Sequence, residues 1–247
     1  MNFEEHCEVF LTTTGNERQI DADILAKCLL SARQKSRVAA GIAKLTVDSP
    51  IPYLLSDLSA VLQAEMGRLD KSGDNAPYSR LKSKIEEIKA DPRYAFMFSG
   101  MLVADTMQAF IAKIFRLPSN GKPISIIDVS AMPSDITSTV VSVLSRLVFD
   151  YAIWSRDEPQ RPILLVCEEA HRYVPNEKNS DGSSVGRILS RIAKEGRKYG
   201  VSLGLITQRP SDLAEGVLSQ CGTIIAMRLN NERDQAFVKA AMPEGAR

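Results

Sequence analysis

Two adjacent acidic residues are the most informative feature of the sequence. Glu168 and Glu169 follow the apolar run Ile163–Cys167, which has the length of a buried strand. Ligands of open α/β sheets bind outside the carboxyl ends of the strands, where both carboxylates would emerge. One carboxylate at such a place can hold Mg²⁺, usually through a water, and the other can orient the water that attacks a γ-phosphate. This pattern predicts Glu168 as the Mg²⁺ residue and Glu169 as the catalytic residue.

Two points about this acidic pair stay open. An acidic strand end that only caps the next helix would have the same sequence. Asp is the usual residue at the magnesium position, and Glu168 is longer by one methylene. Both direct and water-mediated contact with the metal are therefore possible.

A second polar strand end follows 40 residues later at Gln208, which fits one strand–helix–strand unit. The side chain of Gln208 can both donate and accept hydrogen bonds, so it can sense a γ-phosphate or its attacking water. Arg209 and Pro210 come directly after it. The alternative is an exposed turn before Pro210 without a catalytic role.

A basic helix end lies between these two strand ends. Cations recur three or four residues apart at Arg187, Arg191, Lys194 and Lys198. Arg197 stands at the end of the predicted helix, where its guanidinium could reach a phosphate in a neighbouring subunit. A solvated basic face is the alternative interpretation of this stripe, and as evidence for nucleic-acid binding the stripe is weak by itself.

The elements that must position these residues alternate between strand and helix from about residue 121. Continuous apolar strands separated by helices are typical of a parallel sheet covered on both faces. The predicted strands are residues 124–129, 163–167, 201–207 and 222–227, and the predicted helices are 135–154 and 185–199. The sequence therefore predicts an α/β core with about four strands, fewer than a complete doubly wound domain has.

The first part of the chain has a different pattern. Residues 20–43, 54–69, 78–90 and 101–115 repeat apolar side chains at helical spacing or are rich in helix-forming residues. No catalytic arrangement is visible among them. We predict a helical bundle or insertion over residues 1–120 and the α/β core over residues 121–247.

The composition is that of an ordinary globular protein with a formal net charge of +1. The four cysteines are far apart and form no CxxC pair, so neither a zinc site nor a disulfide framework is indicated. No run of 18 apolar residues occurs and the N-terminus is polar and acidic, so neither a membrane span nor a signal peptide is expected. A cytoplasmic setting fits this composition best.

The order of the motifs resembles a known family. The segments LLVCEEAHRYVP, AKEGRKYGVSLGLITQRPSDL and GTIIAMRLNNERDQAFVKAAMPEGA are similar to the C-terminal motor half of HerA-type ATPases of the HerA/FtsK superfamily. The resemblance is strong over residues 121–247 and looser over residues 1–120. It implies a partial RecA-like P-loop NTPase core with an N-terminal helical insertion.

The resemblance also implies roles for single residues. Glu168 and Glu169 match Walker B, Gln208 matches the glutamine of the TQRP motif, and Arg197 matches an arginine that acts in trans. Arg209 or Arg228 could contact phosphate instead. The implied cofactors are ATP and Mg²⁺. The implied partners are double-stranded DNA in the pore of a homo-hexameric ring and, in many relatives, a nuclease of end resection or phage defence.

One motif of such enzymes does not occur in these 247 residues. The only Gly-Lys pair, Gly121-Lys122, is followed by Pro123, so no GxxxxGK[ST] loop is present to cradle phosphates. We expect the chain to be part of a longer motor and to be inactive alone. A degenerate homologue that serves as a non-catalytic scaffold for a partner nuclease or defence effector is the alternative. A stand-alone hydrolase is a poor fit, because there are only two histidines and no nucleophile–base arrangement.

Overall fold

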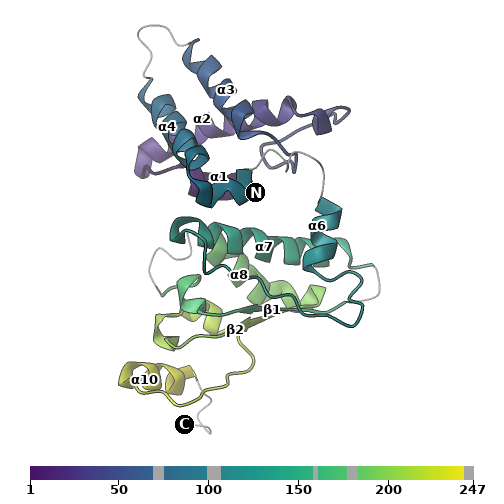
Figure 1. Cartoon of the computed structure of the whole chain (residues 1–247). Helices are drawn as coiled ribbons and strands as arrows, with labels where there is room; N and C mark the ends of the chain where they lie inside the picture. The colour runs from purple at the N-terminus through teal and green to yellow at the C-terminus, as the bar shows by residue number, and fades with distance from the viewer. Residues whose placement is uncertain (69–74, 99–106, 158–160, 177–182, 242–247) are drawn as a thin grey trace. The chain divides into compact units, whose positions relative to one another are not determined.

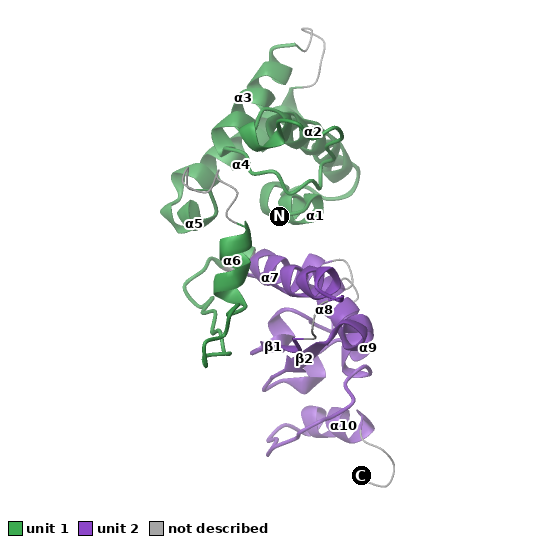
Figure 2. Cartoon of the chain, turned by 90° about the vertical axis from the view of Figure 1, so that its right-hand side faces the viewer, with its two compact units in different colours: residues 1–136 green, residues 137–247 purple. Residues whose placement is uncertain are grey.

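The structure of the protein, a computed structural model, describes residues 1–68, 75–98, 107–157, 161–176 and 183–241. The chain forms two compact units, residues 1–136 and residues 137–247 (Figure 2). This contact boundary lies near the start of a long helix. The predicted division at residue 120 rests on the change from a helical pattern to alternating strands and helices, and it stays a prediction.

The regular elements described in the first unit are all helices, as the sequence predicted for residues 1–120. Its helices are α1 (Phe3–Phe10), α2 (Gly15–Gln34), α3 (Leu55–Met66), α4 (Ala76–Ala90), α5 (Ala95–Phe98) and α6 (Met107–Ile114), with 3-10 turns η1 (Arg37–Ala39) and η2 (Pro92–Tyr94) (Figure 1). The first six residues of the predicted helix 101–115 lie outside the described residues.

The core of this unit forms where α2, α3 and α4 pack against one another. The apolar spacing that predicted these helices also selects the buried side chains. Leu29, Leu58, Leu62, Leu81 and Ile85 are each at most 2 % exposed. Burying one such side chain stabilises the fold by about 1.5–3 kcal/mol, so this core is sufficient to hold the three helices together.

A buried histidine joins α1 to the segment before α3. The ring of His6 is 2 % exposed. Its Nδ1 lies 2.6 Å from the carbonyl oxygen of Asn2 and its Nε2 lies 2.8 Å from the hydroxyl of Tyr53. A neutral imidazole satisfies both contacts, because Nδ1–H donates to the carbonyl and Nε2 accepts from the hydroxyl. Burial, which outweighs the Asn2 hydrogen bond, lowers the pKa of His6 from 6.5 to about 3.

This pKa predicts acid sensitivity of the first unit. The unfolded chain binds a proton at His6 below about pH 6.5, whereas the folded chain does so only near pH 3. The stabilisation is therefore complete above pH 6.5 and is lost as the pH falls from 6.5 toward 3, by about 2 kcal/mol at pH 5. Proton NMR should show that the His6 ring does not titrate between pH 8 and pH 5 in the folded chain. A midpoint near 6.5 for His6 would contradict this account of its burial.

The second unit contains the strands. Its elements are α7 (Ser134–Trp154), β1 (Ile163–Cys167), η4 (Ala170–Arg172), α8 (Ser184–Glu195), η6 (Gly196–Tyr199), β2 (Val201–Leu205), η7 (Pro210–Asp212), α9 (Glu215–Leu218) and α10 (Glu232–Ala241). The bounds of α7, β1 and α8 agree with the predictions to within a few residues. The last turn of the predicted helix 185–199 is the 3-10 turn η6.

The two strands form a parallel sheet, as predicted, in which Ile163 pairs with Val201 and Cys167 pairs with Leu205. Helices α7 and α8 lie on the same side of the strands (Figures 1 and 2). The opposite side carries Leu164 and Val166, which are 64 % and 48 % exposed. The predicted parallel sheet flanked by helices is confirmed, and in the described part of the chain both long helices lie on one side of it.

Two of the four predicted strands are wrong. Residues 124–129 and 222–227 are not in strands, and Ile126 and Ile225 are 91 % and 87 % exposed. A β-branched run becomes a strand only when a neighbouring backbone completes its hydrogen bonds. Within the described residues β1 and β2 pair only with each other, so these apolar runs have no partner.

Helix α7 is long and apolar enough to be considered as a membrane span. By length and composition alone, α7 over residues 136–154 could cross a bilayer. Half of this stretch is buried in the structure, and a core helix of a soluble protein has the same properties. Phe149 on α7 is fully buried, which is consistent with a core helix.

Candidate functional site

The parallel pairing of β1 and β2 brings the two polar strand ends to one edge of the sheet. The backbone continues the pairing beyond the strands, because Ile206 N donates to Cys167 O and Ala170 N donates to Ile206 O, each at 3.0 Å. The segment after β1 therefore lies directly beside the segment after β2. The sequence analysis placed each polar segment at the carboxyl end of a strand, and the structure adds that the two segments lie side by side.

Glu169 and Gln208 contact each other across this edge. Gln208 Nε2 lies 3.5 Å from Glu169 Oε1, at the long limit of a hydrogen bond. Glu169 has a left-handed backbone, with φ 52° and ψ 42°. Such a conformation costs a residue other than glycine about 1–2 kcal/mol and is found most often at functional sites. The turn sends the carboxylate of Glu169 toward the TQRP segment.

Glu168 is exposed at the same edge. The described residues contain no group of three or more His, Cys, Asp or Glu side chains that could hold a metal. Mg²⁺ commonly keeps several waters and takes one or two carboxylates together with the phosphates of its nucleotide. A single accessible carboxylate such as Glu168 fits a Mg²⁺ ion that arrives with a nucleotide, and does not fit a resident metal cage.

The structure adds two residues that the sequence analysis did not select. His171 Nδ1 lies 3.0 Å from Thr207 Oγ1 and 3.5 Å from Glu169 Oε2. Thr207 Oγ1 also accepts a hydrogen bond from Arg209 N at 3.0 Å. In the sequence, only their positions could have indicated these two residues. His171 is two residues after Glu169, and Thr207 directly precedes Gln208.

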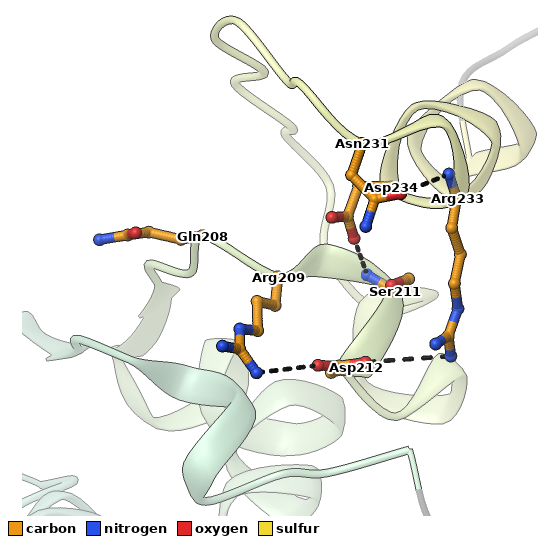
Figure 3. Close-up of a pocket in the computed structure, with 7 residues that line it drawn as sticks. All are labelled: Gln208, Arg209, Ser211, Asp212, Asn231, Arg233 and Asp234. Atoms are coloured by element: carbon orange, nitrogen blue, oxygen red, sulfur yellow. Dashed lines mark hydrogen bonds and ion pairs between the residues drawn. The ribbon is translucent and has the colours of Figure 1, made fainter.

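A polar pocket of about 380 Å³ lies beside this edge (Figure 3). Its lining combines the loop after β2 with the start of α10, through Gln208, Arg209, Ser211, Asp212, Asn231, Arg233 and Asp234. Asp212 lies 4.0 Å from Arg209 and 3.9 Å from Arg233. Both arginines are 69 % exposed, and exposed pairs at this distance contribute little. Arg209 is therefore free to turn toward an anion.

Asp234 fixes the far end of this loop. The buried Asp234 carboxylate accepts a hydrogen bond from Ser211 N at 3.1 Å (Figure 3). Hydrogen bonds from the Ser211 side chain and backbone hold the pKa of the Asp234 carboxyl below its usual range. The loop is thus tied to the sheet at Ile206 and to α10 at Ser211. Gln208 lies exposed between these two anchors, with its side chain pointing away from the other labelled residues (Figure 3).

Arg197 lies at the other end of the sheet. It is an exposed residue of η6, directly before β2. The five residues of β2 span roughly 16 Å at about 3.3 Å per residue, which separates Arg197 from Gln208. Arg197 therefore cannot join Glu169 in one site within a single chain. A role in another subunit is compatible with this position.

The backbone around Arg197 is tightly constrained. A Cβ at Gly196 would lie 2.6 Å from Val201 O, and Gly200 ends the turn with φ 75°. The ring of Tyr199 packs edge-on against Phe149, with the centroids 5.5 Å apart. These contacts fix the turn, while the Arg197 side chain itself remains exposed.

Arg228 is not brought to the site by any contact in the described residues. It lies in the exposed, irregular segment between α9 and α10, three residues before the pocket residue Asn231. Its suggested contact with phosphate stays a prediction.

Comparison with known proteins identifies the family. Residues 1–148, more than half of the chain, match the family described as "Helicase HerA, central domain". The chain belongs to this HerA family. Glu168, Glu169, Arg197 and Gln208 lie beyond the matched residues, so their roles depend on the geometry and on the sequence motifs.

Curated relatives extend the similarity. A DNA double-strand break repair helicase HerA of Pyrococcus furiosus is 50 % identical over 80 residues, 32 % of this chain and 14 % of its own length. A HerA helicase of Saccharolobus solfataricus is 29 % identical over 216 residues, 82 % of this chain and 39 % of its own length. A probable HerA helicase of Methanocaldococcus jannaschii is 34 % identical over 163 residues, 65 % of this chain and 31 % of its own length. The matched region thus spans well under half of these relatives.

A solved structure supports the fold. The chain resembles VirB4 of Thermoanaerobacter pseudethanolicus with a TM-score of 0.59 and 14 % identity, over 98 % of this chain and 60 % of that one. This likeness concerns the fold alone. Together with the parallel strand pair, it supports the predicted partial RecA-like α/β core.

Proposed function

We propose that these residues form the hydrolytic part of an ATP-driven DNA translocase of HerA type. The observation that carries the proposal is the contact between Glu169 and Gln208, which joins the acidic end of β1 to the TQRP segment after β2. Membership of the HerA family supports the assignment of this edge to a nucleotide.

Each residue has a distinct role in this proposal. Glu169 orients the attacking water and accepts its proton, and Gln208 reports whether the γ-phosphate or that water is present. Glu168 would hold Mg²⁺, which neutralises the charge that develops on the phosphates. Arg209 faces the neighbouring pocket and could contact phosphate. Arg197 completes the site of an adjacent subunit, because it is remote from its own Glu169.

In this proposal the phosphate-binding loop comes from elsewhere in the polypeptide. No GxxxxGK[ST] motif occurs in the 247 residues, and the described sheet leaves one face uncovered. We propose that the chain functions within a longer protein of the kind represented by its relatives, and that it does not hydrolyse ATP alone.

The proposed substrate is double-stranded DNA. Five of the curated relatives are described as DNA double-strand break repair helicases or probable ones. By analogy, the longer protein would form a homo-hexameric ring around DNA in the cytoplasm and act with a partner nuclease or a defence effector. None of this requires a membrane.

A second candidate is a non-catalytic scaffold that docks such a partner. The absence of a phosphate-binding loop from the 247 residues is the observation that favours it. The contact between Glu169 and Gln208 favours the motor, because a scaffold has no need of this pair.

Phosphate release by the longer protein, with and without linear double-stranded DNA, tests the proposal. A motor should hydrolyse ATP in the presence of Mg²⁺ and do so faster when DNA is added. ATP turnover that does not respond to DNA would contradict the assignment as a translocase and support the assignment as an ATPase. No turnover under either condition would favour the scaffold.

A further inference from the structure

His171 occupies a central position between the two strand-end segments. Its side chain is 18 % exposed, whereas that of Glu169 is 46 % exposed. One ring atom, Nδ1, lies 3.0 Å from Thr207 Oγ1 and 3.5 Å from Glu169 Oε2. The ring therefore contacts the segment after β1 and the segment after β2 through a single nitrogen.

The neighbours of Nδ1 determine where the imidazole carries hydrogen. An ionised carboxylate only accepts hydrogen bonds, so a hydrogen on Nδ1 suits the nearby Glu169 Oε2 at 3.5 Å. Thr207 Oγ1 accepts from Arg209 N at 3.0 Å and retains a second lone pair for Nδ1–H. A single Nδ1–H can therefore donate to Thr207 Oγ1 while it faces the Glu169 carboxylate.

Among the described residues, the side chains of Gln208 and His171 lie next to the Glu169 carboxylate. Its backbone is left-handed and its side chain is half-exposed, so packing alone does not select one orientation. Gln208 contacts Oε1 at 3.5 Å, and His171 contacts Oε2 at the same distance. Each oxygen thus faces one polar side chain, and Thr207 contacts the ring that faces Oε2.

We infer that His171 and Thr207 form a positioning pair that orients the Glu169 carboxylate toward the attacking water. The inference rests on the proposed function, because it assigns the pair a role in the same site. His171 touches Glu169, and Thr207 acts through His171. The pair also links the Walker B segment to the TQRP segment, so a shift of either segment changes the orientation of Glu169.

Substitutions of Thr207 in the longer protein test the pair through turnover. Thr207→Val keeps the shape but removes the oxygen, and it should lower kcat for ATP about 10-fold to 100-fold, as expected when a catalytic group is misplaced. The melting temperature should stay unchanged, and the double substitution with His171→Ala separates the contact to His171 from the hydrogen bond that Arg209 N also loses. Thr207→Ser keeps the oxygen and should restore most of the loss. A wild-type kcat for Thr207→Val would overturn the inference.

A double substitution separates a shared role from two independent ones. If Thr207 acts through His171, His171→Ala combined with Thr207→Val should be no slower than His171→Ala alone. Independent losses that multiply in the double variant would contradict the pair. Glu169→Gln in the same assay shows whether the proposed function itself holds.

A second measurement does not depend on activity. The 247-residue chain contains only His6 and His171, so ¹⁵N-histidine NMR gives two ring systems, and His171→Gln identifies the signals of His171. We expect a hydrogen on Nδ1 of His171, with a nitrogen shift that changes in Thr207→Val and much less in Thr207→Ser. A neutral ring with its hydrogen on Nε2, unaffected by Thr207→Val, would overturn the inference even if the longer protein hydrolyses ATP.

Discussion

Replacing Glu169 with glutamine should abolish ATP hydrolysis by the longer protein while ATP binding remains. Glutamine has the same length and the same backbone preferences, so the left-handed turn at this position should persist. It cannot accept the proton of the attacking water, however, and loss of a general base typically lowers a rate about 10²–10⁴-fold. Phosphate release measures turnover, and calorimetry with ATP and Mg²⁺ measures binding.

A matched control uses Glu215, an exposed glutamate at the start of α9 and outside the site. Glu215→Gln removes the same charge from the same unit and should keep wild-type turnover. Normal turnover in Glu169→Gln would remove this residue from the mechanism, whatever the control shows.

The second large effect concerns Arg197. If its guanidinium stabilises the phosphates bound to a neighbouring subunit, Arg197→Ala should lower turnover about 10³-fold or more, as for other arginine fingers. Its place at the opposite end of β2 from Gln208 excludes a contribution to its own site. Lys198→Ala is the matched control, because Lys198 is an exposed cation in the same turn.

Mixing two inactive variants tests the action in trans directly. A subunit with Arg197→Ala keeps Glu169, and a subunit with Glu169→Gln keeps Arg197. In a mixed ring, some interfaces combine Glu169 from the Arg197→Ala subunit with Arg197 from the Glu169→Gln subunit. These interfaces contain a complete site. Mixtures should therefore regain a fraction of wild-type turnover. Mixtures as inactive as their components would show that Arg197 does not act across the interface.

The sequence alone predicted the elements that carry the site. The apolar runs of β1 and β2 have strand length, and parallel strands with a helix between them bring their carboxyl ends to one edge. By this rule, the acidic pair after β1 lies near the TQRP segment after β2. The contact between Glu169 and Gln208 agrees with the rule.

The strand count could not be predicted in the same way. Residues 124–129 and 222–227 have the composition of buried strands, yet Ile126 and Ile225 are almost fully exposed. Composition reports a preference for a pleated, half-buried surface, whereas a strand also requires a partner backbone. Whether such a partner is present is a property of the whole fold and is not written in either run.

The contact of His171 with Thr207 was also beyond sequence analysis. It depends on the left-handed turn at Glu169 and on backbone pairing beyond the ends of both strands. The left-handed turn and the backbone pairing determine where the two side chains lie. The spacing of residues in the sequence specifies neither feature. The sequence could place His171 near the site, but it could not identify its partner.

Calorimetric titration with ATP and Mg²⁺ tests the central claim most directly, using the 247-residue chain and the longer protein side by side. The account predicts binding by the longer protein and none by the 247 residues alone, because these residues carry Glu168, Glu169 and Gln208 but no phosphate-binding loop. Binding by neither protein would contradict the claim that this edge serves a nucleotide. Tight binding by the 247 residues alone would contradict the claim that the phosphate site lies elsewhere in the polypeptide.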